Sequence, residues 1–161
     1  MPGKAGKTFE PREERMLSEW LARTYQTGRI IQRVRLGPIL TNLANAPLNL
    51  AEYNLVGNVR RWADAVVILP DRVVLIEAAI LPDPGDVSRL HLYAELWPHT
   101  PEYSEYTGLP LELVLLTAIP DPVLVRIAGK FGVSCVQYTP DWISEYLATL
   151  TSRAQRATPS A

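Results

Sequence analysis

The sequence predicts an α/β protein with a mixed central sheet flanked by helices. Two runs of β-branched residues meet at Pro70-Asp71 and indicate a hairpin. Two later apolar runs, over residues 111–119 and 133–138, each follow a helical segment, which favours parallel pairing with the preceding strand. With an amphipathic segment at residues 12–26 in front, the predicted order of elements is α-β-β-β-α-β-α-β-α.

Length and composition indicate one globular domain. The chain has 161 residues, of which 47% are hydrophobic and 20% charged. A single cysteine excludes an internal disulfide framework. Because the first residues form no apolar leader and no run approaches 18 apolar residues, we expect no membrane span and a cytoplasmic location, or a virion if the chain is phage-encoded. We assign residues 1–11 to a flexible arm, 12–152 to the domain and 153–161 to a polar tail.

The first helix is expected over residues 12–26, ending before Gly28. Its inner stripe contains Met16, Leu17, Trp20 and Leu21, with Glu13 near the N-terminal end of that stripe.

A strand is expected over residues 29–36. Regular alternation would put Ile31, Arg33 and Arg35 on one face, and the other face would contain Ile30, Gln32, Val34 and Leu36. Residues 37–58 then form a long connection rich in leucine and asparagine, and loops of this length are usually functional or form an interface.

The hairpin at Pro70-Asp71 brings two acids together. Its register pairs Ile68 with Val73 and Val66 with Leu75, and therefore Asp64 with Glu77. Like charges so placed repel, and Glu77 lies inside the apolar run VVLIEAAI, where an unpaired carboxylate is costly. A Mg²⁺ ion held by both acids would compensate them. Alternatively, Glu77 is protonated or is neutralised by one of the arginines Arg60, Arg61 and Arg89.

The pattern Asp64…Glu77-Ala78-Ala79 resembles the active-site hairpin of the PD-(D/E)XK, or restriction-endonuclease-like, nuclease superfamily. The resemblance extends over residues 12–150 and implies an αβββαβ core, with Asp64 and Glu77 as ligands of Mg²⁺ or Mn²⁺. In the superfamily, a lysine two positions after the glutamate helps to orient and activate the attacking water. That position is Ala79 here, so the chain resembles a degenerate member.

A helix is expected from residue 84 or 85 to residue 97, with Arg89 and Tyr93 one turn apart on one face. Some nuclease-like families place a Gln-x-x-x-Tyr pair at the corresponding position, so the resemblance adds Arg89 and Tyr93 to the catalytic region, and Arg89 is the favoured counter-ion of Glu77. The alternative is a surface arginine lying over a tyrosine ring. The first helix often donates an acid in this superfamily, which makes Glu13 a candidate, although a first-turn glutamate also complements the helix dipole.

Basic residues cluster although the net charge is only −1. Residues 29–61 contain one acid, Glu52, against five arginines that predict a DNA-binding edge beside the acid pair: Arg29, Arg33, Arg35, Arg60 and Arg61. The alternative is a solvated basic face.

The C-terminal part predicts a helix capped by Asp121, opened by Pro122 and ended by Gly132. A last helix is expected to end near Thr151.

Three functions remain open from the sequence. In the first, the chain is a non-catalytic, degenerate nuclease fold that acts as a DNA-proximal or structural subunit of a larger assembly, such as a phage or mobile-element particle, with protein partners or further copies of itself. In the second, it is an active Mg²⁺-dependent DNA endonuclease or exonuclease in which Arg89, Lys130 or His91 replaces the lysine. In the third, it is an α/β protein-binding module without a nucleic-acid role.

Overall fold

The computed structural model describes residues 10–38 and 60–157. Its centre is a sheet in the order β1-β2-β3-β4-β5, in which the first three strands are antiparallel and β4 and β5 continue parallel to β3. The strands are β1 Arg29–Leu36, β2 Arg61–Ile68, β3 Val73–Ala79, β4 Leu111–Thr117 and β5 Val133–Gln137. The α/β class with a mixed sheet is therefore confirmed. Most of the predicted arm and of the connection at 37–58 lies outside the described residues.

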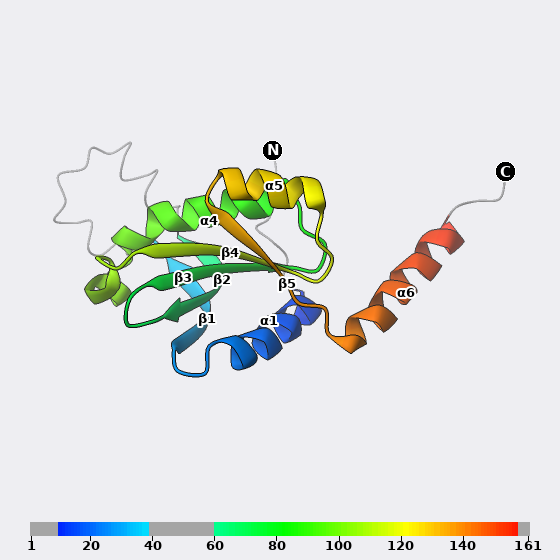
Figure 1. Cartoon of the computed structure of the whole chain (residues 1–161), viewed down its shortest axis with the longest axis horizontal. Helices are drawn as coiled ribbons and strands as arrows, with labels where there is room; N and C mark the ends of the chain where they lie inside the picture. Colours follow the sequence, from blue (N-terminus) through cyan, green and yellow to red (C-terminus); the bar gives the residue numbers. More distant parts are fainter. Residues whose placement is uncertain (1–9, 39–59, 158–161) are drawn as a thin grey trace.

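Helices cover both faces of the sheet (Figure 1). Helix α1 (Pro11–Thr24) lies on one face, and helices α4 (Pro84–Leu96) and α5 (Pro122–Lys130) lie on the other. Two short 3-10 helices, η1 (Trp97–His99) and η2 (Pro101–Tyr106), connect α4 to β4. Helix α6 (Asp141–Ala157) starts near α1 and extends beyond the sheet.

Strand β3 is buried along its whole length and separates two hydrophobic cores. Val73, Leu75 and Ala79 pack towards α4 and α5, whereas the alternate residues, from Val74 to Ile80, pack towards α1. Because side chains alternate along a strand, Glu77 points to the same face of β3 as Leu75 and Ala79. Its carboxylate is therefore directed into the core on the α4 side.

The β2–β3 hairpin has the predicted register. Leu69 N donates to the Arg72 carbonyl at 2.9 Å, which closes the corner at Pro70-Asp71. The paired residues run from Ile68–Val73 to Ala65–Ile76. The paired residues end one position before Asp64 and Glu77, and beyond them Ala78 N donates to the Asp64 side chain.

The predicted faces of strand β1 are wrong beyond Gln32. Arg33 has a φ of 54°, in the left-handed region, which costs a non-glycine residue roughly 1 kcal/mol. The alternation of faces breaks there, so Val34 and Leu36 share the α4-side core with Ile31. Regular alternation assumes an unbroken extended backbone, and Arg33 does not have one.

The predicted start of one helix is confirmed by its capping residue, whereas two predicted helix ends differ from the structure. Asp121 accepts hydrogen bonds from the main-chain nitrogens of Val123 and Leu124, as predicted for the start of α5. Helix α1 ends at Thr24, two residues before the predicted end at residue 26. Helix α6 continues to Ala157, so the predicted end near Thr151 is wrong: the segment SRAQRA is polar, but its Arg, Ala and Gln residues are good helix formers.

Candidate functional site

Glu77 lies at the centre of the site predicted from the hairpin. Its side chain is fully buried. Its Oε1 accepts a hydrogen bond from Arg89 Nε at 2.8 Å, and its Oε2 lies 3.2 Å from the Tyr93 hydroxyl, which donates to it. Helix α4 presents Arg89 and Tyr93 one turn apart, so both reach the same carboxylate. The prediction that Arg89 is the counter-ion of Glu77 is confirmed.

Asp86 holds Arg89 in place from the other side, and sequence reasoning missed it. Its Oδ1 accepts from Arg89 Nη2, and its Oδ2 accepts from Asp83 N at 2.7 Å. The Asp83 side chain in turn accepts from Gly85 N and from the main chain of Asp86, and the second of these bonds completes a capping box at the start of α4. The spacing of Asp83 and Asp86, together with an Asp–Arg pair at i, i+3, was the signal available in the sequence.

The carboxylate of Asp64, on β2, forms a hydrogen bond with the main chain of the neighbouring strand β3. Its Oδ2 accepts a hydrogen bond from Ala78 N at 2.8 Å. The Tyr93 hydroxyl, which contacts Glu77, is also 2.9 Å from the Trp62 carbonyl, and its single proton serves one acceptor at a time. The structure thus gathers Asp64, Glu77, Arg89 and Tyr93 at one end of the hairpin.

The protonation of the site follows from burial and charge. Burial and the negative charges of Glu77 and Asp64 raise the pKa of Tyr93, which keeps its hydroxyl neutral. Burial alone would lower the pKa of Arg89, but the hydrogen bond and charge of Glu77, with the charge of Asp86, raise that pKa overall. Arg89 is therefore a permanent cation, and it cannot take a proton from water.

These residues do not fit a divalent cation. Glu77 Oε1 already accepts from Arg89, Glu77 Oε2 shares the Tyr93 proton with the Trp62 carbonyl, and one oxygen of Asp64 accepts from the main chain. A metal ion bound to Glu77 would lie beside the guanidinium of Arg89, and the two cations would repel each other. Across residues 10–38 and 60–157, no group of three or more His, Cys, Asp or Glu side chains is placed to hold a metal ion.

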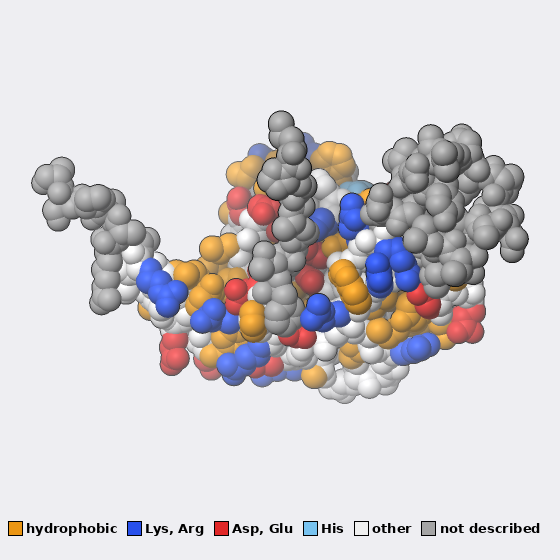
Figure 2. Space-filling model, turned by 180° about the vertical axis from the view of Figure 1, so that it is seen from behind, with side chains coloured by type: hydrophobic (Ala, Val, Ile, Leu, Met, Phe, Trp, Pro, Cys, Tyr) orange, Lys and Arg blue, Asp and Glu red, His pale blue; other side chains and the backbone are white. Residues whose placement is uncertain are grey.

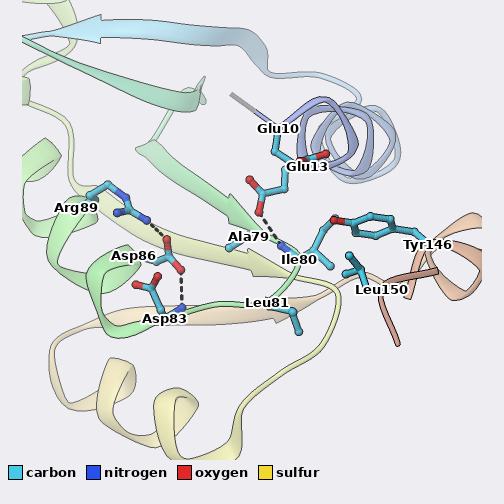
Figure 3. Close-up of a pocket in the computed structure, with 10 residues that line it drawn as sticks. All are labelled: Glu10, Glu13, Ala79, Ile80, Leu81, Asp83, Asp86, Arg89, Tyr146 and Leu150. Carbon is cyan, nitrogen blue, oxygen red and sulfur yellow. Dashed lines mark hydrogen bonds and ion pairs between the residues drawn. The ribbon is translucent and has the colours of Figure 1, made fainter. Parts of the chain in front are cut away.

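A cavity of about 430 Å³ adjoins the site at the end of β3, between α1, the start of α4 and α6 (Figure 3). Ala79, which the sequence resemblance aligns with the lysine of the superfamily, lines it. Glu13 also lines it, and its Oε1 accepts from Ile80 N at 3.1 Å. The acid of the first helix is therefore close to this end of β3, where it caps the main chain.

Of the predicted DNA-binding arginines, Arg33, Arg35 and Arg61 are exposed and lie at the same end of the sheet as the acid site. Arg35 pairs across strands with Trp62, and Arg61 pairs with Leu36. Arg29 pairs with Ile68 at the other end of β1, about 20 Å away for six residues of strand. The structure therefore separates Arg29 from the other predicted arginines.

Arg60 has contacts that brace the fold. Its Nε donates to the Gly37 carbonyl at 3.0 Å, and its Nη2 donates to the Arg35 carbonyl at 3.3 Å and to Glu102. Its side chain is only 15% exposed. Arg60 thus ties the start of β2 to the end of β1 and to η2.

The other proposed substitutes for the lysine lie elsewhere. His91 packs edge-on against Phe131, and Lys130 is exposed on the last turn of α5. Of the three candidates, Arg89 is the one in contact with Glu77.

No family model, curated protein or solved structure matches this chain. The resemblance to the nuclease superfamily therefore depends on the residues and the element order described above. Among the described residues, no helix is both long and apolar enough to cross a membrane.

Proposed function

We propose that this chain is a non-catalytic domain with a nuclease-like layout, and that it binds DNA as a subunit of a larger assembly. The ion pair between Glu77 and Arg89 is the observation that carries the proposal. Arg89 supplies the positive charge that a metal would supply in an active nuclease, and the layout of the hairpin is retained around it.

Catalysis is disfavoured by two features of the same site. Arg89 cannot act as a base, and the methyl group of Ala79 offers neither charge nor a hydrogen bond to an attacking water. Loss of one electrostatic contributor of this kind typically reduces a rate about 10²–10³-fold. The remaining groups are held by one another, with Glu77 between Arg89 and Tyr93.

DNA binding is supported by the exposed arginines at the same end of the sheet. Arg33, Arg35 and Arg61 come from two neighbouring strands. Viewed from behind, the molecule shows several basic side chains on its surface, interspersed with acidic and apolar ones (Figure 2). Guanidinium groups suit phosphate oxygens because they can donate two hydrogen bonds at once.

A protein-binding module is the second candidate, favoured by the outer face of α5. Val123, Ile127 and Phe131 recur every four residues and are 55%, 40% and 58% exposed. Exposed apolar side chains that adjoin in this way mark contact surfaces for other proteins. A subunit of an assembly could use this face and still contact DNA through β1 and β2.

Nicking of supercoiled plasmid in Mg²⁺ or Mn²⁺ tests the catalytic part of the proposal. We expect no nicking by the parent chain and no metal binding in calorimetry. Ala79→Lys combined with Arg89→Gln restores the lysine and removes the competing cation, so we expect metal-dependent nicking at least about 10²-fold above the parent. Adding Asp64→Ala to that variant should abolish it. Nicking by the parent chain that disappears in Arg89→Gln would overturn the proposal and establish an active nuclease with a relocated basic residue.

The DNA-binding part is tested in the same protein without metal. Affinity for a DNA duplex should fall with salt, and Arg33→Ala with Arg35→Ala should flatten the slope of log affinity against log salt by about two. Arg29→Ala is the control: it removes one arginine charge at the far end of β1 and should leave the slope unchanged. A complete lack of binding at low salt would favour the protein-binding module.

A further inference from the structure

Trp62 is unusual among the tryptophans of this chain because its side chain is 55% exposed. Trp20 and Trp97 are buried, and Trp142 is partly buried against α1. Trp62 also lies on a central β-strand, where a large ring is usually covered. The ring therefore presents a large flat apolar surface to solvent at the end of the sheet that contains the acid site.

Two arginines flank this ring. The guanidinium carbon of Arg33 lies 5.8 Å from the ring centroid, and that of Arg35 lies 5.9 Å from it, at the outer limit of cation–π contact. Arg61 is the next residue along the strand and is exposed. The positive charges thus lie beside an aromatic surface that is still more than half open to solvent.

The backbone of Arg33, next to this ring, is in a conformation that is unfavourable for a non-glycine residue. Arg33 is the non-glycine residue with a positive φ in the described chain, and it is a long residue with no special tolerance for that conformation. If β1 continued its regular alternation there, Val34 and Leu36 would lose their places in the core. The left-handed conformation of Arg33 keeps Val34 and Leu36 buried, while Arg33 and Arg35 remain beside Trp62. Strain retained in this way at a surface cluster points to a binding role.

Trp62 is also held from the interior. Its carbonyl accepts from the Tyr93 hydroxyl, which belongs to the buried Glu77 site. The residues on each side, Arg61 and Ala63, are paired with β1. The ring therefore projects from a fixed main chain, and little backbone ordering is needed when a ligand binds.

We propose that Trp62, with Arg33, Arg35 and Arg61, forms a stacking platform for an unpaired nucleotide base, so that the chain binds single-stranded DNA or the single-stranded part of a junction in preference to duplex. This rests on the proposed DNA-binding function and specifies its ligand. Bases in a duplex are stacked on one another and cannot offer a face to an exposed ring, whereas any unpaired base can. The arginines contact the flanking phosphates and make binding salt-dependent.

The test compares a short oligo(dT) with a duplex of equal length, using the full chain and reading both tryptophan emission and affinity. We expect oligo(dT) to bind more tightly and to quench emission. Trp62→Ala should weaken oligo(dT) binding about 10-fold or more and leave duplex binding and the salt slope unchanged, because no charge is removed. Trp62→Phe should retain most of the affinity for oligo(dT), since a phenyl ring still stacks.

The outcomes separate the two proposals. If the duplex binds as tightly as oligo(dT) and Trp62→Ala changes neither, the stacking platform is wrong and the DNA-binding function stands. If neither nucleic acid binds at low salt, the DNA-binding function is wrong and the platform falls with it. Because the Trp62 side chain is exposed, both variants should keep the parent melting temperature, and a circular dichroism melt checks this. A large drop in that temperature for Trp62→Phe would mean that the ring is a packing residue, which also overturns the platform.

Discussion

Two glutamates in this chain make nearly the same contacts in different surroundings. Glu77 accepts from Arg89 Nε at 2.8 Å and from the Tyr93 hydroxyl at 3.2 Å. On the opposite face of the sheet, Glu19 of α1 accepts from Arg15 Nε at 3.1 Å and from the Tyr138 hydroxyl at 3.3 Å. Trp142 Nε1 of α6 also donates to Glu19 at 3.1 Å. Glu77 is completely buried, whereas the side chain of Glu19 is 31% exposed.

The difference teaches that burial, more than the set of partners, decides what each glutamate requires. Water can replace a lost partner of Glu19, so its contacts mainly orient α6 against α1. Water cannot reach Glu77, so a missing partner would leave a charge unpaired in the core. The same set of donors can therefore serve as an adjustable clamp at the surface and as an obligatory counter-charge inside.

Removing the counter-charge of Glu77 should have the largest effect. Arg89→Met keeps the length of the side chain but leaves the Glu77 carboxylate without its cation, and we expect a loss of about 3–5 kcal/mol in the free energy of unfolding. Urea denaturation measures this loss.

The double variant Glu77→Leu with Arg89→Met removes both charges and should recover much of the lost stability, since an apolar replacement of a buried pair is often close to neutral. Arg15→Met is the matched surface control. Equal costs for Arg89→Met and Arg15→Met would show that burial does not distinguish the two glutamates.

An intermediate effect is expected at Tyr93. Tyr93→Phe removes the hydroxyl shared by Glu77 Oε2 and the Trp62 carbonyl, which should cost about 1–3 kcal/mol because a buried acceptor is left unsatisfied.

The same change should alter the stability at alkaline pH. The pKa of Tyr93 is raised in the folded state, so its contribution is present below the ordinary tyrosine pKa of about 10 and is lost as the pH rises further. The parent should therefore lose more stability than Tyr93→Phe between neutral pH and pH above about 10. The pKa values of Tyr25 and Tyr138 are raised as well, so the difference between the two proteins, measured by urea denaturation at each pH, isolates Tyr93. Parallel pH curves would contradict the pairing with Glu77.

Much of the Glu77 site could be predicted from the sequence because it depends on local rules. A Pro-Asp corner fixes the hairpin register, and that register brings the two acids to the same end of neighbouring strands. A spacing of four residues brings Arg89 and Tyr93 to one face of α4. An acid inside an apolar run also demands a counter-ion. What the residues could not decide was whether that cation is a metal or Arg89, because both satisfy the same electrostatic requirement.

The faces of β1, the role of Arg60 and the contacts of Glu19 could not be predicted, because they depend on features that residue patterns do not encode. The alternation of β1 predicted the wrong face for Val34 because one residue, Arg33, leaves the extended conformation. Arg60 was grouped with the exposed arginines, but its carbonyl partners are main-chain groups that sequence does not mark. The Glu19 clamp joins residues more than a hundred positions apart, with no periodic pattern to connect α1 and α6.

The smallest effect is expected at the Glu19 clamp, and it tests whether that site is the adjustable one. The hydrogen bond from Trp142, followed by those from Arg15 and Tyr138, lowers the pKa of Glu19 against the opposing effect of burial. Its contribution is therefore present above the ordinary glutamate pKa of about 4.3 and is lost as the pH falls through the lowered value. Arg15→Ala should cost only about 0.3–0.5 kcal/mol, as expected for an exposed pair four residues apart on a helix.

Acidification should shift the emission of Trp142 in a Trp62→Phe background before the chain unfolds, because its indole loses a charged acceptor. In Glu19→Gln, which keeps an acceptor but cannot titrate, that acid shift should be absent. An acid shift of equal size in both proteins would mean that Glu19 does not hold α6 through its charge.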